Sequence, residues 1–210
     1  MRKIAIMIIV VVTFGGVVSG VWLLQNQSPS SPEAIPSLIN GSKRVINPDE
    51  HSYTDIDFAQ KMIVHDQQGI QMADIATRNA ANEEVRILAM RISEGLSRDT
   101  DQYASWLKEW DEKYFNLSDF PEMDGHDMYP TFSGMASYEQ MSVLATASGN
   151  EAAKLFLQMA IVHHEGAAEM ANSVAFESLQ FGQMVDLKTS TLRRQAEEIQ
   201  TMKQLQANIE

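Results

Sequence analysis

Apolar positions recur at helical spacing from about residue 54 to the end of the chain, and Gly and Pro interrupt them only between long segments. This pattern predicts four long helices and one short helix, over residues 54–79, 82–113, 137–150, 151–178 and 182–208. Asn82 is expected to cap the second helix, and Ser137 with Gln140 to form a capping box that opens the short one. Since no segment shows the alternation of a strand, the fold class is predicted to be all-α.

One stretch of this pattern occurs twice, 98 residues apart. The segment from Phe58 to His65 returns as the segment from Phe156 to His163, and a Met-Ala pair follows each copy at the same distance. The repeat indicates two helical hairpins, over about 52–113 and 150–208, joined by one long connection. That organisation is typical of a ferritin-like four-helix bundle, which we expect over residues 51–210.

The N-terminal segment has a different pattern. Residues 4–24 contain no charge and follow Arg2 and Lys3, so residues 1–24 are expected to form a signal anchor, that is, a transmembrane helix. A cleaved signal peptide is the alternative, since Ser19 and Gly20 are small enough for a cleavage site. Under either interpretation, the rest of the chain is expected to be exported. Residues 25–50, rich in Ser and Pro, are expected to be a flexible linker to a domain on the periplasmic or extracellular face.

Composition narrows the classes of function. The net charge of −12 disfavours nucleic acid as a partner. The chain has no cysteine, which excludes disulfides, thiolate zinc sites and cysteine nucleophiles. It has 13 methionines instead, and methionine is the soft ligand that an oxidising compartment does not remove by pairing.

The buried stripe of each long helix is expected to carry polar residues near its middle. A seven-residue step stays on one helix face, so His65 and Met72 share one stripe and His163 and Met170 share another. Gly69 and Ala167, one turn after the two histidines, leave space beside the rings. The stripes of the second and fifth helices carry acids, and the fifth also carries Met202. The two acids are Asp99, on the second helix, and Glu198, on the fifth.

Two interpretations of these residues remain open. A buried acid or imidazole costs free energy unless it is paired or binds a metal. In the first interpretation, His65 and His163 donate hydrogen bonds to Asp99 and Glu198 in a structural polar layer. In the second, the histidines and methionines bind a metal, with His164 as a further imidazole. A separate candidate lies in the loop of residues 114–136, where His126 stands between two methionines and suits a copper ion.

The repeated phrase, Met-Ile-x-His-His-x-x-Ala-x-x-Met-Ala in its full form, resembles the family called domain of unknown function 305. The resemblance covers about residues 50–208 and is closest over Ile161–Ala171 and Gln195–Met202. It implies a ferritin-like, exported protein, and some members of the family are implicated in periplasmic copper binding. The metal ligands that it implies are His65, Met72, His163, His164, Met170 and Met202.

This chain departs from the family pattern in its first half. Asp66 replaces the second histidine of the first copy, and Ala153 replaces an Asp that the first copy keeps as Asp55. On the second helix, Leu96, Asp99 and Tyr103 stand where the family has Gln, Glu and Met. The first half is therefore expected to offer fewer soft ligands than the second.

These features together predict a membrane-tethered, extracytoplasmic metal-binding protein that sequesters or transfers copper, with Glu198 and His126 as additional ligands. A bundle whose polar layer serves only structure or protein interaction is the alternative. A ferritin-like oxidase is a weaker one, because such enzymes use Glu-x-x-His and no histidine here has Glu three residues before it. Catalysis is not expected, although the sequence leaves that question open.

Overall fold

The computed structural model describes residues 50–120, 132–175 and 178–209, and within these ranges the secondary structure is helical apart from one isolated bridge between Ala80 and Gly149. The all-α prediction is confirmed. The elements are α1 (Tyr53–Asn79), α2 (Glu83–Glu109), the short 3-10 helix η1 (Leu117–Asp119), α3 (Tyr138–Thr146), α4 (Gly149–Ser173) and α5 (Gly182–Asn208).

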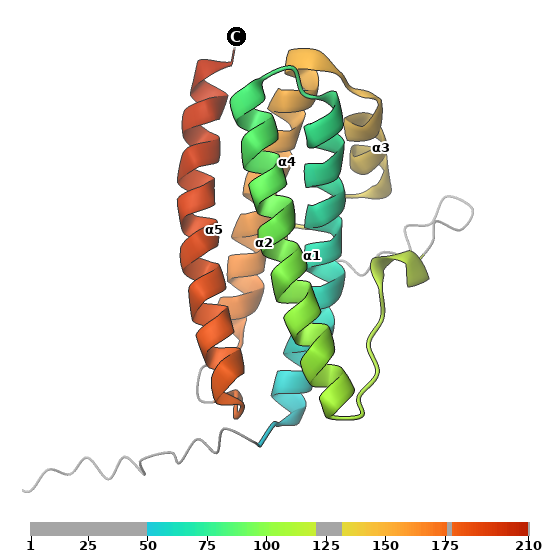
Figure 1. Cartoon of the computed structure of the whole chain (residues 1–210), viewed down its shortest axis with the longest axis vertical. Helices are drawn as coiled ribbons and strands as arrows, with labels where there is room; N and C mark the ends of the chain where they lie inside the picture. The colour runs from blue at the N-terminus through green and yellow to red at the C-terminus, as the bar shows by residue number, and fades with distance from the viewer. Residues whose placement is uncertain (1–49, 121–131, 176–177, 210) are drawn as a thin grey trace, which may run out of the picture. The chain divides into compact units, whose positions relative to one another are not determined.

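The four long helices pack side by side around a common core. Their contacts form a ring, in which α1 contacts α2, α2 contacts α5, α5 contacts α4, and α4 contacts α1. Neighbouring helices run antiparallel, as Figure 1 shows, and the long crossover between α2 and α4 carries α3 against the outer side of α1 and α4. A helix that buries one stripe requires partners on that side, and this ring supplies two for each helix.

The helix starts follow the predicted capping residues. Asn82 accepts a hydrogen bond from the backbone N–H of Val85, and Ser137 and Gln140 form the expected capping box. At the start of α1, Ser52 forms a second capping box with Asp55. Each cap satisfies amide groups that have no partner within the helix, which fixes where the helix begins.

Three helix ends differ from the prediction. The second helix ends at Glu109 rather than at 113, because Asp111 adopts the left-handed conformation with φ of 57°. The fourth ends at Ser173 rather than at 178, where buried Lys188 donates a hydrogen bond to the carbonyl of Val174. The short helix ends at Thr146 rather than at 149–150, because Gly149, with φ of 66°, already opens α4.

The interior consists of two apolar clusters with a polar layer between them. Along α1, for example, Phe58 to Ile63 belong to one cluster and Met72 to Ala76 to the other, and the buried polar residues lie in between. The same order holds along α2, α4 and α5. The bundle therefore positions polar side chains from four helices at one level of its core.

Three sequence predictions lie wholly or mostly outside the described residues: the transmembrane helix of residues 1–24, the linker of residues 25–50, and the candidate ligand His126. Within the described ranges, no helix is long and apolar enough to cross a bilayer.

Candidate metal centre

The polar layer brings together side chains from all four long helices. Its members are almost completely buried, and they include each stripe histidine and acid near the middle of the predicted helices. They are His65, Asp66 and Gln68 from α1, Asp99 from α2, His163 and His164 from α4, and Thr191, Gln195 and Glu198 from α5.

His65 and His163 face each other across the contact between α1 and α4. Their ring centroids are 3.9 Å apart at an interplanar angle of 36°, and Nε2 of His163 donates a hydrogen bond of 3.1 Å to the carbonyl oxygen of His65. Gly69 allows this approach, because a Cβ at that position would lie 2.9 Å from Cε1 of His163. Burial, together with the nearby His65 and His164, lowers the pKa of His163 well below its ordinary value, so this ring is neutral.

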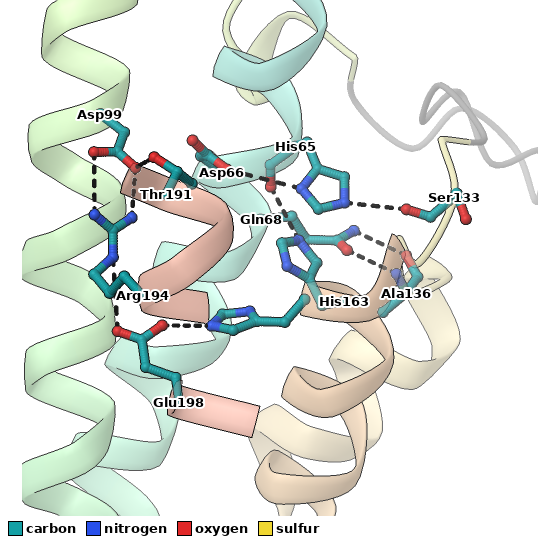
Figure 2. A network of polar contacts seen from close by, with 11 residues as sticks. His65, Asp66, Gln68, Asp99, Ser133, Ala136, His163, Thr191, Arg194 and Glu198 are labelled. Carbon is teal, nitrogen blue, oxygen red and sulfur yellow. Dashed lines mark hydrogen bonds and ion pairs between the residues drawn. The ribbon is translucent and has the colours of Figure 1, made fainter. Parts of the chain in front are cut away.

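A short segment of the crossover, residues 132–136, covers the outer side of this histidine pair, and we call it the strap. The carbonyl oxygen of Ser133 accepts a hydrogen bond of 3.1 Å from Nε2 of His65. The side-chain amide of Gln68 binds the other end of the strap. It donates a hydrogen bond of 2.8 Å to the carbonyl of Ala136 and accepts one of 2.7 Å from the N–H of Ala136. Figure 2 shows both contacts beside the two rings.

The strap lies directly on α4 because two glycines permit it. Gly134 has φ of 80°, and a Cβ at Gly166 would lie 2.2 Å from the carbonyl oxygen of Ser133. A hydrogen bond of 2.6 Å from Ser133 Oγ to Glu169 fixes the strap on its outer side. The strap is thus held closely enough to keep the ring of His65 in one orientation.

His164 belongs to a second set of contacts on the opposite side of the layer. Its Nε2 donates to Glu198 at 2.8 Å, and the other oxygen of Glu198 lies 3.7 Å from Nε of Arg194. Arg194 also donates two hydrogen bonds to Asp99, which accepts a third from Thr191 at 2.8 Å. Figure 2 shows this chain from Asp99 through Arg194 to Glu198.

Asp66 differs from the other two carboxylates. It is completely buried, yet neither oxygen has a hydrogen-bond partner among the described residues. Its Oδ1 lies 3.8 Å from Nδ1 of His65, which is too long for a hydrogen bond. Burial raises the pKa of Asp66, and this effect exceeds the opposing attraction of His65. Burial and the charges of Asp66 and Asp99 also raise the pKa of Tyr103 well above its ordinary value.

Eight polar side-chain atoms in and beside the layer, the Asp66 oxygens included, are buried and unpartnered within the described part of the chain. Two of them are imidazole nitrogens, and an imidazole nitrogen with a free lone pair is a common metal donor. The atoms are Nδ1 of His65, Nδ1 of His164, both Asp66 oxygens, Thr100 Oγ1, Tyr103 OH and both amide atoms of Gln195. The donor set therefore fits a metal ion. Among the described residues, no three His, Asp or Glu side chains are arranged as a ready-made metal cluster.

The predicted methionine ligands lie on either side of the layer rather than in it. Met72 and Met202 are completely buried in one apolar cluster, while Met170 is half-buried beside the other. Met170 lines a surface pocket of about 280 Å³ together with Ser133 of the strap. The structure thus groups the predicted histidines with Glu198 and separates Met170 from the other two sulfur atoms.

The structural interpretation of the sequence is wrong in its partners. His65 and His163 donate to backbone carbonyls instead of to Asp99 and Glu198. Asp99 is occupied by Arg194, which sequence reasoning missed although it lies one turn before Glu198. The sequence did not predict Asp66 as a site residue. The available signal was its place in the repeat, because Asp66 occupies the position that His164 occupies in the second copy.

No curated protein matches the chain. The sequence model of the family described as "Domain of unknown function (DUF305)" matches residues 55–206. A DUF305 protein of Streptomyces coelicolor, inferred to be secreted, has a similar structure, with 29% identity, a TM-score of 0.64, and coverage of 74% of this chain and 91% of that one.

Two further structures are similar. A DUF305 fragment from Deinococcus radiodurans, at 23% identity and a TM-score of 0.64, covers 75% of this chain and 98% of its own and supports the fold alone. The protein CopM in its Cu(I)-bound form has 26% identity and a TM-score of 0.57, with coverage of 75% and 98%. CopM structures in Cu(II)-bound and Ag-bound forms are similar as well.

Proposed function

Because the chain belongs to the family called domain of unknown function 305, whose model matches residues 55–206, we propose that it is an exported protein that binds copper in the polar layer of its bundle. The observation that carries this proposal is the pair of buried imidazole nitrogens without partners, Nδ1 of His65 and Nδ1 of His164. A lone pair buried without a hydrogen bond costs free energy, and a metal ion bound there removes that cost.

The way in which the rings are held supports the proposal. Metal-binding histidines usually donate the other ring N–H to a carboxylate or a backbone carbonyl, which orients the ring. His65 donates to the Ser133 carbonyl and His164 to Glu198, and in each ring the remaining nitrogen is the unpartnered one. A purely structural layer has no need of this arrangement, because it gains stability only from contacts that are made.

Copper is the proposed cargo for two reasons. Imidazole and thioether donors together suit Cu(I), and copper stands highest in the affinity order of divalent first-row metals. The similar protein CopM has been solved with copper in both oxidation states. The proposed ligands in the layer are His65, His163, His164 and Glu198. The further proposed ligands are three methionines and the loop histidine, namely Met72, Met170, Met202 and His126.

We further propose that the bundle is ferritin-like and is held outside the cytoplasm by residues 1–24, with residues 25–50 as a linker. The uncharged stretch after Arg2 and Lys3 supports this placement, as does the similarity to a protein inferred to be secreted. The role that fits is sequestration or transfer of copper. The mass of the native protein distinguishes a retained anchor from a cleaved signal peptide.

A structural role for part of the layer is supported by a specific observation. Asp99 accepts hydrogen bonds from Arg194 and Thr191 and is therefore engaged as a link between α2 and α5. We assign Asp99 to this link and leave it out of the proposed ligand set.

Metal analysis of the full-length protein tests the proposed function. The chain is purified from the membrane and periplasmic fractions of an exporting host after copper and iron are supplied together. Copper bound in a constant ratio to protein is the expected result, and its loss on replacing both His163 and His164 places it in the layer. Bound iron without copper, or no bound metal, would reject the proposal.

A further inference from the structure

The contact between His65 and Asp66 places two hydrogen-bond acceptors close together, unless Asp66 carries a proton or a cation lies between them. Nε2 of His65 lies 3.1 Å from the carbonyl oxygen of Ser133. A carbonyl oxygen can only accept, so the ring must carry its hydrogen on Nε2. In a neutral imidazole, Nδ1 then has a lone pair and no hydrogen. Nδ1 lies 3.8 Å from Oδ1 of Asp66, which also offers only lone pairs when it is ionised.

The separation of these two atoms is informative. At 3.8 Å they are too far apart for a hydrogen bond. A metal bound at about 2.1 Å from each atom allows the two atoms to lie up to about 4.2 Å apart, so one ion can contact both. Both atoms are buried and have no other partner in the described part of the chain. The spacing therefore fits one cation between two donors.

The geometry points to a nitrogen–oxygen site in which Nδ1 of His65 and Oδ1 of Asp66 bind one divalent transition-metal ion, with Cu(II) the best-fitting member of that class. The site rests on the proposed metal-binding function and adds to it a ligand, Asp66, and a donor atom, Nδ1. The preference follows from the donors, because carboxylate oxygen with imidazole nitrogen suits divalent ions, whereas Cu(I) favours sulfur.

The surroundings of Asp66 favour a cation at this position. The charge of Asp99 acts on Asp66, but Arg194 already pairs with Asp99. Asp99 and Glu198 each pair closely with a basic side chain, whereas the only such contact of Asp66 among the described residues is with His65 at 3.8 Å. An ionised carboxylate buried in this way is stable only with a compensating positive charge.

The repeat gives a reason for the difference between the two halves of the molecule. Asp66 stands at the position of His164 in the second copy, so the first half has a carboxylate where the second has an imidazole. The second half carries more of the predicted soft donors, Met170 and Met202, than the first, which carries Met72. One chain then provides a site for the divalent ion and a softer region, which suits a protein that meets copper in both oxidation states.

The test measures Cu(II) affinity of the full-length chain against a competing chelator. Asp66→Asn is expected to weaken Cu(II) binding at least tenfold, as loss of a charged ligand does, while Cu(I) binding changes little. The matched control is Asp74→Asn, because Asp74 is an exposed acid of the same helix, and it should leave both affinities unchanged. Asp66→His, which copies the residue of the second repeat, should shift the preference toward Cu(I).

A second readout needs no metal. Nitrogen NMR of the metal-free protein at neutral pH should show His65 with hydrogen on Nε2 and none on Nδ1. A doubly protonated His65 would mean that the ring itself supplies the charge, and that result would overturn the site. Unchanged Cu(II) affinity in Asp66→Asn overturns it too, and leaves the proposed function intact if replacing His163 and His164 still abolishes binding. Absence of copper binding in the wild type rejects both.

Discussion

At the scale of single residues, Asp66 shows that the layer is not arranged for stability alone. A buried carboxylate without a hydrogen-bond partner costs more free energy than a neutral amide of the same shape. Such a residue persists in a fold when it serves another purpose, and violations of the usual rules of packing gather at functional sites.

The cost of burying Asp66 predicts how the stability of the metal-free protein depends on pH. Burial raises the pKa of Asp66 above its ordinary value of 3.8, so the folded chain holds the proton more tightly than the unfolded chain does. Its stability should therefore fall as the pH rises from about 4 through the folded pKa. Asp66→Asn removes this loss and should be more stable than wild type at pH 7, by about 1–3 kcal/mol.

Urea unfolding in the presence of a chelator, at pH 7 and at pH 4, measures the difference. It should shrink toward pH 4, because both chains then carry a neutral group at position 66. A wild type as stable as the variant at pH 7 would show that the carboxylate is compensated within the metal-free protein.

Asp55 is buried like Asp66 but fully bonded, and its role is different. It accepts hydrogen bonds from the backbone and hydroxyl of Ser52 at 2.8 and 2.6 Å, and from the backbone N–H groups of Gln180 and Phe181 at 3.0 and 3.3 Å. It thereby joins the start of α1 to the loop before α5. This acid of the family pattern is a structural link in this chain.

Replacing Asp55 with Ala should therefore destabilise the bundle by about 3–5 kcal/mol, since buried N–H groups lose a charged acceptor. Chemical denaturation measures the change. Asp57→Ala is the control, because Asp57 forms only a partly exposed ion pair with Lys61 and should cost about 0–1 kcal/mol. Similar losses from the two variants would contradict the structural role of Asp55.

At the scale of elements, the strap determines how His65 is presented. Gly166→Ala would place a Cβ 2.2 Å from the carbonyl oxygen of Ser133, so the strap must move away from α4. We expect a loss of about 1–3 kcal/mol in stability and a changed nitrogen NMR signature of His65. Gly95→Ala is the comparison, because its Cβ would meet only the flexible Arg194 side chain at 3.1 Å. An unchanged His65 signature in Gly166→Ala would show that the strap does not orient the ring.

The starts of the helices could be predicted because short local motifs fix them, as Asn82 and Ser137 do. The ends of α2, α3 and α4 could not, because they depend on the backbone conformations of Asp111 and Gly149 and on the contact of Lys188 with Val174. Within the site, the repeat and the heptad spacing located the buried histidines. The strap was predicted only as loop, since its position rests on backbone contacts with α1 and α4 that leave no pattern in the sequence.

At the scale of the whole molecule, the two halves are expected to differ in their affinity for Cu(I). Met170 lines a pocket beside the strap, whereas Met72 is completely buried in an apolar cluster. Met170→Leu should weaken Cu(I) binding more than Met72→Leu, and each change should cost less than about 1.5 kcal/mol in folding. Chelator competition measures both affinities. A larger loss from Met72→Leu would reverse the asymmetry, and equal losses would indicate one shared site.

The central claim is that buried histidines hold copper, and one titration tests it most directly. The full-length wild type and the double variant His163→Gln, His164→Gln are titrated with Cu(I) against a competing chelator, with circular dichroism to establish that both are helical. We predict saturable binding in the wild type and an affinity at least tenfold lower in the variant, as expected when imidazole ligands are removed. Equal affinities in the two folded proteins would contradict the account.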